Sequence, residues 1–240
     1  VEVQLYEWAI KEIEKAINIA PNLPDAYNEL GYIYEIQQQW AKARAEYIKF
    51  GQLVPKWKSY VDLRIGQLFI LENNLEQAEK AFREAISLAP ENLDIAPSAN
   101  LFLADIYRKQ SRKKEMREAC ANVVSLVSRA ESPDFKALRQ QGLAHFIGGE
   151  YQEAAQSLNR ALEANPQDPQ ARFYLALNLL CQGQSDLAQE ELQQGIHLAP
   201  YKSYYQYAIE GAEVLAAQTP EVPGAKEMLQ KLIEAKNNAK

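Results

Sequence analysis

The stretch "ISLAP" at residues 86–90 has two near copies in the same chain, "INIAP" at 17–21 and "IHLAP" at 196–200. In each copy, alanine and proline follow a short run that begins with isoleucine. Because proline cannot continue the interior of a helix, each copy predicts a point where a helix ends. A phrase that returns in this way also predicts internal repeats, and the interval between the copies decides their kind.

The prolines that end such phrases are regularly spaced. Pro21 and Pro55 are 34 residues apart, Pro55 and Pro90 are 35 apart, and Pro166 and Pro200 are 34 apart. The separation of Pro90 and Pro166 is 76 residues, which is two intervals and eight additional residues. We therefore expect one closing proline to be missing and short insertions to lie in the middle of the chain.

Within each interval, apolar and small residues recur three and four positions apart in two runs. This spacing places them on one face of each of two helices. Small residues at the eighth position of the interval let two helices approach closely, so Gly31 and Gly66 are predicted to lie at close helix contacts. Stretches such as "LENN" at 71–74 and "IGGE" at 147–150 predict the turn between the two helices. Each interval is thus predicted to be a helix hairpin that cannot bury its apolar face alone.

This pattern resembles the tetratricopeptide repeat family along nearly the whole chain. The resemblance implies an all-α fold, a helix-hairpin solenoid wound as a right-handed α–α superhelix, with roughly thirteen helices. We expect a single array over residues 1–240. Its parts are the second helix of a truncated repeat at 1–21, repeats at 24–57, 59–92, 97–130 (divergent), 135–168 and 169–202, and terminal capping helices at 203–240.

The first segment, residues 1–21, matches only the second helix of a hairpin. We therefore expect further chain before Val1 in the native protein. Without its hairpin partner this helix is predicted to leave apolar surface uncovered, which would be available for self-association. The residues concerned are Tyr6, Trp8, Ile10 and Ile13.

Composition narrows the class of protein. The chain has 240 residues and a formal net charge of −6, which disfavours nucleic acid as a partner because phosphate-binding proteins are normally basic. Cys120 and Cys181 have no paired spacing, so neither a disulfide framework nor a zinc site is expected. No run of apolar residues approaches the length of a membrane span. We expect a cytoplasmic protein, or a membrane-peripheral one if an anchor precedes residue 1.

Residues with catalytic chemistry are scarce. The only histidines are His145, at a packing position, and His197, near a helix end where it can favour the helix dipole. The sequence has no glycine-rich phosphate loop, no HExxH and no GxSxG. We therefore expect no enzymatic activity, no cofactor and no metal site.

The resemblance also implies where a partner binds. In the family, the first helix of each repeat lines a concave groove, and carrying its positions over gives candidate partner-binding residues. Relatives that capture a chaperone carboxylate use a clamp of Lys and Asn, from which this sequence departs at Asn28 and Tyr32. The mixture of aromatic and cationic residues instead suits an apolar segment that bears an acidic residue. The candidates are Asn28, Tyr32, Gln67, Asp105, Arg139, Phe173, Tyr204 and Tyr207.

Two local stretches are further candidates. In "YKSYYQY" at 201–207, tyrosines offer large contact area with a polar tip, or they seal the stack against the final helix. The basic stretch "RKQSRKKEMR" at 108–117 is either a solvated edge or a patch for an anionic partner, such as an acidic protein surface or anionic lipid headgroups. The patch would consist of Arg108, Lys109, Arg112, Lys113, Lys114 and Arg117.

These patterns favour a non-catalytic scaffold or adaptor that binds a peptide or helix of a partner protein in its groove. Two alternatives stay open: the regulatory or targeting domain of a larger enzyme, and a membrane-associated assembly factor whose anchor has been removed. Any membrane contact is expected to be indirect.

Overall fold

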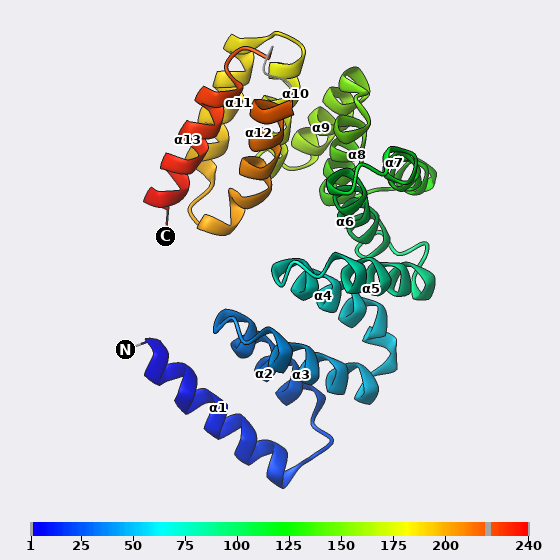
Figure 1. Ribbon diagram of the computed structural model, residues 1–240, viewed down its shortest axis with the longest axis vertical. Coiled ribbons are helices and arrows are strands. Elements are labelled where there is room, and N and C mark those ends of the chain that lie inside the picture. Colours follow the sequence, from blue (N-terminus) through cyan, green and yellow to red (C-terminus); the bar gives the residue numbers. More distant parts are fainter. Residues whose placement is uncertain (1, 219–221, 240) are drawn as a thin grey trace. The chain divides into compact units, whose positions relative to one another are not determined.

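A computed structural model describes residues 2–218 and 222–239, apart from the side chains of 2–4, 207, 210, 214 and 216–218 (Figure 1). This part of the chain contains thirteen α-helices, two short 3-10 helices and no strand. None of its helices is both long and apolar enough to cross a membrane. The helices group into two compact units, residues 1–116 (unit 1) and residues 117–240 (unit 2).

Unit 1 contains six complete helices, and a seventh begins at its end. They pack in order along the chain, and each of the helix pairs α2–α3 and α4–α5 forms a tight hairpin. The elements are α1 (Glu2–Ile19), α2 (Pro24–Ile36), α3 (Trp40–Leu53), η1 (Pro55–Trp57), α4 (Lys58–Leu71), α5 (Leu75–Leu88), α6 (Ala96–Lys109) and the start of α7 (Lys113–Arg129).

Unit 2 contains the rest of α7 and the remaining helices. Its hairpins are α8–α9 and α10–α11, after which α12 packs on α10, and α13 packs on α11 and α12. The elements are α8 (Phe135–Gly148), α9 (Tyr151–Ala164), α10 (Pro169–Cys181), α11 (Ser185–Leu198), η2 (Lys202–Tyr204), α12 (Gln206–Gln218) and α13 (Ala225–Asn238).

The hairpin turns share one backbone conformation. Each has a single residue with positive φ, which lets the chain reverse after the first helix. The next residue then donates its N–H to a carbonyl of the last turn of that helix, with N···O distances of 2.8–3.0 Å. The residues with positive φ are Gln38, Asn73, Ser111, Gly149 and Gly183.

Close helix approach occurs at the predicted glycines. A Cβ atom placed on Gly31 would lie 2.8 Å from the ring of Tyr47, and one placed on Gly66 would lie 2.5 Å from the ring of Phe82. Tyr47 and Phe82 are both almost fully buried. The glycines therefore make room for aromatic side chains of the second helix, which confirms the predicted contacts of Gly31 and Gly66.

The first helix, α1, packs on the first hairpin through one face only. Ile10 and Ile13 lie against the core of α2 and α3, whereas Leu5 and Trp8 are 59% and 63% exposed. The predicted apolar surface of this helix is thus partly covered and partly open. Its role in self-association stays a prediction.

Candidate protein-binding surface

A polar bridge fixes α4 against the first hairpin of unit 1. Arg64 on α4 donates from Nη2 to Glu35 Oε2 on α2 at 2.5 Å, and from Nη1 to Gln67 Oε1 at 3.0 Å. Its guanidinium also lies 5.8 Å from the ring centroid of Tyr47, whose hydroxyl donates to Glu35 at 3.0 Å. One arginine thereby joins the facing sides of two consecutive first helices.

Exposed apolar side chains lie on the same two helices as this bridge. Tyr32 is 53% exposed and Ile36 is 40% exposed, and they are one turn apart on α2. At the equivalent positions of α4, Gln67 is half-buried and Leu71 is 58% exposed. We call these four residues the α2–α4 strip. Large apolar side chains held open on neighbouring helices are typical of a protein-interaction surface.

The other candidate residues of unit 1 are less available. Asn28 is half-buried on α2. Asp105 on α6 accepts ion pairs from Arg108 at 2.5 Å and from Lys109 at 2.7 Å. The carboxylate of Asp105 is therefore largely neutralised within its own helix.

In unit 2 the prediction of Phe173 as an open binding residue is wrong. Phe173 is only 1% exposed, and its ring lies where a Cβ atom on Gly195 would come within 2.6 Å. The ring of Tyr205 covers it at a centroid distance of 5.3 Å. Phe173 is therefore a core residue that links α10, α11 and the segment before α12.

Arg139 is not a free cation, which corrects its predicted role as the cationic element of the groove. Its Nη1 lies 2.6 Å from Oδ2 of Asp168, a carboxylate that is only 3% exposed. Asp168 also accepts hydrogen bonds from the backbone N–H groups of Gln170 and Ala171 at the start of α10. The arginine thus compensates a buried carboxylate that caps the next helix.

The tyrosine-rich stretch has two roles. Tyr205 is 2% exposed and donates its hydroxyl to the carbonyl of Ala199 at 3.0 Å, so it seals the end of the α10–α11 hairpin. Tyr204 is half-buried and stacks on exposed Tyr201. The side chain of Tyr207 lies outside the described residues.

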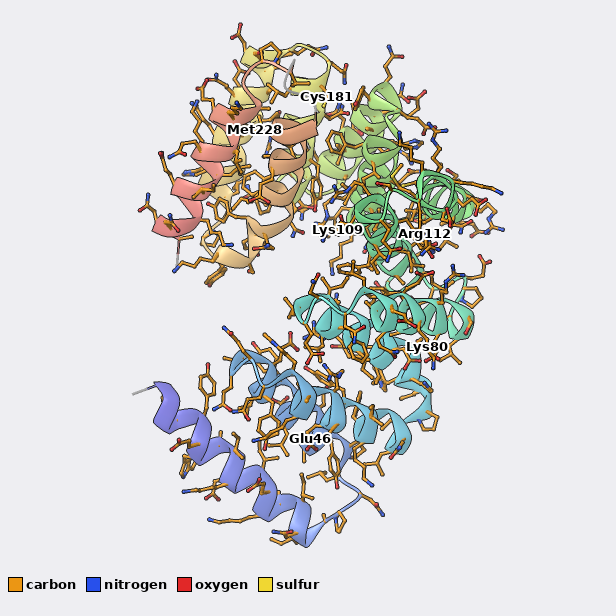
Figure 2. The ribbon with its side chains drawn as sticks, viewed as in Figure 1. Glu46, Lys80, Lys109, Arg112, Cys181 and Met228 are labelled. Atoms are coloured by element: carbon orange, nitrogen blue, oxygen red, sulfur yellow. The ribbon has the colours of Figure 1, made fainter. Side chains whose placement is uncertain are left out.

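The basic stretch is not a block of free cations. Lys109 and Arg112 are labelled in Figure 2. Arg108 and Lys109 pair with Asp105, and Arg112 pairs with Glu79 at 2.8 Å and with Glu115 at 2.9 Å. These hydrogen bonds, first to Glu79 and then to Glu115, raise the pKa of Arg112. The remaining cations of the stretch, Lys113, Lys114 and Arg117, are exposed.

Two residues with catalytic chemistry have structural surroundings. His145 Nδ1 lies 2.6 Å from Glu150 Oε2 at the α8–α9 turn. Burial raises the pKa of the Cys120 thiol to about 12, so the reactive thiolate is scarce at neutral pH. Over residues 2–218 and 222–239, no cluster of His, Cys, Asp and Glu side chains has the arrangement of a metal site.

Comparison with known families identifies the repeat. Models of the tetratricopeptide repeat match residues 12–45, 63–92 and 146–210, which together make up more than half of the chain. The chain belongs to the tetratricopeptide repeat (TPR) family. No curated protein sequence matches it.

Solved structures show the same TPR fold. Yeast Tom70 has a TM-score of 0.62 at 22% identity, over 94% of this chain and 46% of Tom70. The Cut9–Hcn1 hetero-tetramer of the APC/C gives 0.60 at 17%, over 96% of this chain and 40% of the other. The type IV pilus biogenesis factor PilW gives 0.59 at 20%, over 88% and 98%. This chain therefore spans less than half the length of the Tom70 and Cut9–Hcn1 chains.

Counting TPR positions missed part of the α2–α4 strip. Ile36 and Leu71 are the thirteenth residues of their repeats and close the first helices, where Leu71 had been included in a turn-like stretch. Two large apolar residues at the same repeat position, next to a polar turn, were the signal available in the sequence. Arg64 and Glu35 could not be paired from the sequence, because they are 29 residues apart.

Proposed function

We propose that this TPR protein is a non-catalytic scaffold that binds an apolar segment of a partner protein on the α2–α4 strip. Proteins built from helix-hairpin repeats use the extended surfaces of consecutive repeats for binding. The observation that carries the proposal is the exposure of Tyr32, Ile36 and Leu71 on the two helices that the Glu35–Arg64–Gln67 bridge joins.

The strip favours an apolar partner segment with hydrogen-bonding groups between its apolar residues. Tyr32 offers a large, rigid contact area at a small cost in conformational entropy. The Arg64 bridge supplies polar groups on the same helices, where Glu35 compensates the charge of Arg64 and Gln67 accepts one of its hydrogen bonds. Buried apolar and aromatic anchors commonly carry most of the energy of an interface, and polar contacts around them fix the register.

The chain offers two matched pairs of residues for a test. Ile36 on α2 is 40% exposed and Ile48 on α3 is 46% exposed. Leu71 on α4 is 58% exposed and Leu88 on α5 is 53% exposed. Within each pair the residue type and exposure are alike, and the helix differs. The first member belongs to the strip and the second lies on a second helix.

The experiment is a selection of displayed peptides on the purified chain, followed by calorimetric titration of the selected peptides. Ile36→Ala and Leu71→Ala should each weaken binding by about 2 kcal/mol, roughly thirtyfold, as expected for interface anchors. Ile48→Ala and Leu88→Ala should leave the affinity unchanged. Equal loss in both members of each pair, or loss confined to the second helices, would remove the strip as the binding surface.

A further inference from the structure

A tetrapeptide of the form aromatic–Lys–Ser–Tyr occurs once in each unit. It reads "WKSY" at 57–60 and "YKSY" at 201–204. Each copy lies just after a proline that ends a second helix, and each overlaps a 3-10 helix, η1 or η2. We call these segments the aromatic turns. The scaffold function proposed above does not use them.

In both turns the two aromatic rings contact each other and one of them is open. Trp57 is 47% exposed and its ring centroid is 5.8 Å from that of Tyr60. Tyr201 is 55% exposed and its ring centroid is 6.3 Å from that of Tyr204. The inner ring of each pair is half-buried, so it supports the outer ring in an exposed position.

Lysines flank the exposed rings. Lys56 is exposed beside Trp57, and Lys202 is exposed beside Tyr201. Lys58 pairs with Asp62 at 2.8 Å, yet its side chain is still 52% exposed. Connections of the same kind elsewhere in the chain, "PENLD" at 90–94 and "PQDP" at 166–169, carry acidic residues and no aromatic residue. The combination of aromatic and cationic residues therefore distinguishes these two turns.

We propose that the aromatic turns bind the surface of a membrane that contains anionic lipids. Tryptophan and tyrosine prefer the headgroup region, where an apolar ring and a polar edge are both satisfied. A lysine near an anionic leaflet strengthens binding by about fivefold, and its aliphatic stem can lie along the apolar boundary. The turns thus hold the two residue types that an interfacial contact needs.

Ring geometry favours a lipid surface over a shaped peptide. The planes of Trp57 and Tyr60 are inclined at 78°, whereas those of Tyr201 and Tyr204 are inclined at 29°. A peptide that reads a fixed groove would meet two different surfaces. A fluid headgroup layer accepts both, because it requires aromatic area and positive charge without a fixed ring geometry.

The membrane contact is separate from the proposed protein contact. Trp57 precedes α4 and Leu71 ends it, so about 20 Å of helix separates these two exposed side chains, and about 10 Å of helix separates Tyr60 from Gln67. Variants at one surface should therefore leave binding at the other unchanged. Failure of either proposal can be recognised without reference to the other.

The test is sedimentation of the full chain with vesicles of phosphatidylcholine, with and without phosphatidylserine. We expect binding to the mixed vesicles that weakens with added salt, and little binding to phosphatidylcholine alone. Trp57→Ala and Tyr201→Ala should each reduce the bound fraction, by about tenfold for the tryptophan. Lys56→Glu should weaken the preference for phosphatidylserine. Circular dichroism should show that each variant keeps its helical content.

Trp8→Ala is the matched control, because Trp8 on α1 is 63% exposed and lies outside the aromatic turns. It should bind vesicles like the unmodified chain. In fluorescence, mixed vesicles should shift tryptophan emission to shorter wavelength, and Trp57→Phe should lose this shift while Trp8→Phe keeps it. Absence of binding to mixed vesicles, or equal loss in Trp8→Ala, would overturn the proposal. The proposal would also be overturned if an oligoglutamate peptide changed the emission of Trp57 and vesicles did not. The partner would then be an acidic protein segment.

Discussion

The hairpin turns of the two units have the same backbone conformation but different residues at its strained point. In unit 1 the residues with positive φ are Gln38, Asn73 and Ser111, at φ values of 57° to 59°. In unit 2 they are Gly149 and Gly183, at 82° and 75°. A residue with a Cβ atom in this region costs roughly 1–2 kcal/mol, less for asparagine. The turns of unit 1 therefore carry local strain that the glycines of unit 2 avoid.

The units also differ in the surface left by equivalent repeat positions. At the ninth position, Tyr32 in unit 1 is 53% exposed, whereas Leu177 in unit 2 is 1% exposed. The reason is α12, which packs on α10 and brings Gly211 so close that a Cβ atom there would lie 2.9 Å from Leu177. A helix outside the regular repeats thus closes the face that the first hairpins of unit 1 leave open.

The largest expected effect on stability tests a feature that the two units share, which is the close approach of two helices at a glycine. Gly66→Leu should lower the free energy of unfolding by about 3 kcal/mol, because even a Cβ atom would lie 2.5 Å from the buried ring of Phe82. Gly51→Ala is the control, since its Cβ atom would meet Val61 at 3.4 Å. Denaturant unfolding of both variants measures the difference. An unchanged midpoint for Gly66→Leu would contradict the close helix contact.

The helix hairpins, which both units share, are also the part of the fold that the sequence predicts. Small residues at the eighth position and the spacing of the prolines predicted the hairpins, because close packing allows few side chains at these places. The burial of Phe173 could not be predicted by counting repeat positions, because it depends on Gly195 and on Tyr205 from the following segment. A glycine at 195, where two other repeats have alanine at 85 and 161, was a local sign that a ring would be buried there.

Ion pairs between repeats are the other feature that the sequence did not predict. Arg139 looked like a free cation because Asp168 is 29 residues away in the chain. Arg64 was not recognised at all, because its partner Glu35 belongs to the preceding repeat. Spacing within one repeat predicts which residues share a helix face, but contacts between repeats depend on how the hairpins pack.

An intermediate effect on stability is expected at Glu79 of unit 1, whose carboxylate is held by several hydrogen bonds. Glu79 on α5 accepts hydrogen bonds from Arg83, Arg112 and Tyr107. Burial raises the pKa of its carboxyl group, but these hydrogen bonds, led by the one from Arg112, outweigh burial and lower it below the ordinary 4.5. Glu79→Gln should therefore cost about 1–2 kcal/mol at neutral pH. The loss should shrink as the pH falls through the lowered pKa, because protonation removes the same charge.

Glu46→Gln is the control of opposite sign. Burial, and then the nearby charge of Glu14 on α1, raise the pKa of Glu46, which is labelled on α3 in Figure 2. A raised carboxyl pKa weakens the fold above the ordinary pKa, so Glu46→Gln should stabilise unit 1 at neutral pH and have no effect in acid. Urea unfolding at several pH values measures both variants. The same pH dependence for Glu79→Gln and Glu46→Gln would contradict the assigned electrostatics.

The smallest effect concerns the turns and addresses the difference between the units directly. Ser111→Gly should stabilise unit 1 by about 0.5 kcal/mol, because relief of the left-handed strain exceeds the entropy that glycine adds to the unfolded chain. Asn73→Gly should change little, since asparagine tolerates this conformation. Thermal unfolding followed by circular dichroism measures both. A loss of stability in Ser111→Gly would mean that the serine side chain supports the turn.

Gly183→Ala provides the reverse experiment in unit 2. No atom lies within 4 Å of the position where its Cβ would be, so the substitution meets no steric barrier from neighbouring groups. Any loss of stability, expected to be about 1 kcal/mol, must come from the backbone at φ 75°. If Ser111→Gly gains stability and Gly183→Ala loses it, the two units place different residues under the same conformational constraint. If neither variant changes the stability, the packing of the hairpins alone determines the turn. The residue at this position then has no effect on the free energy of unfolding.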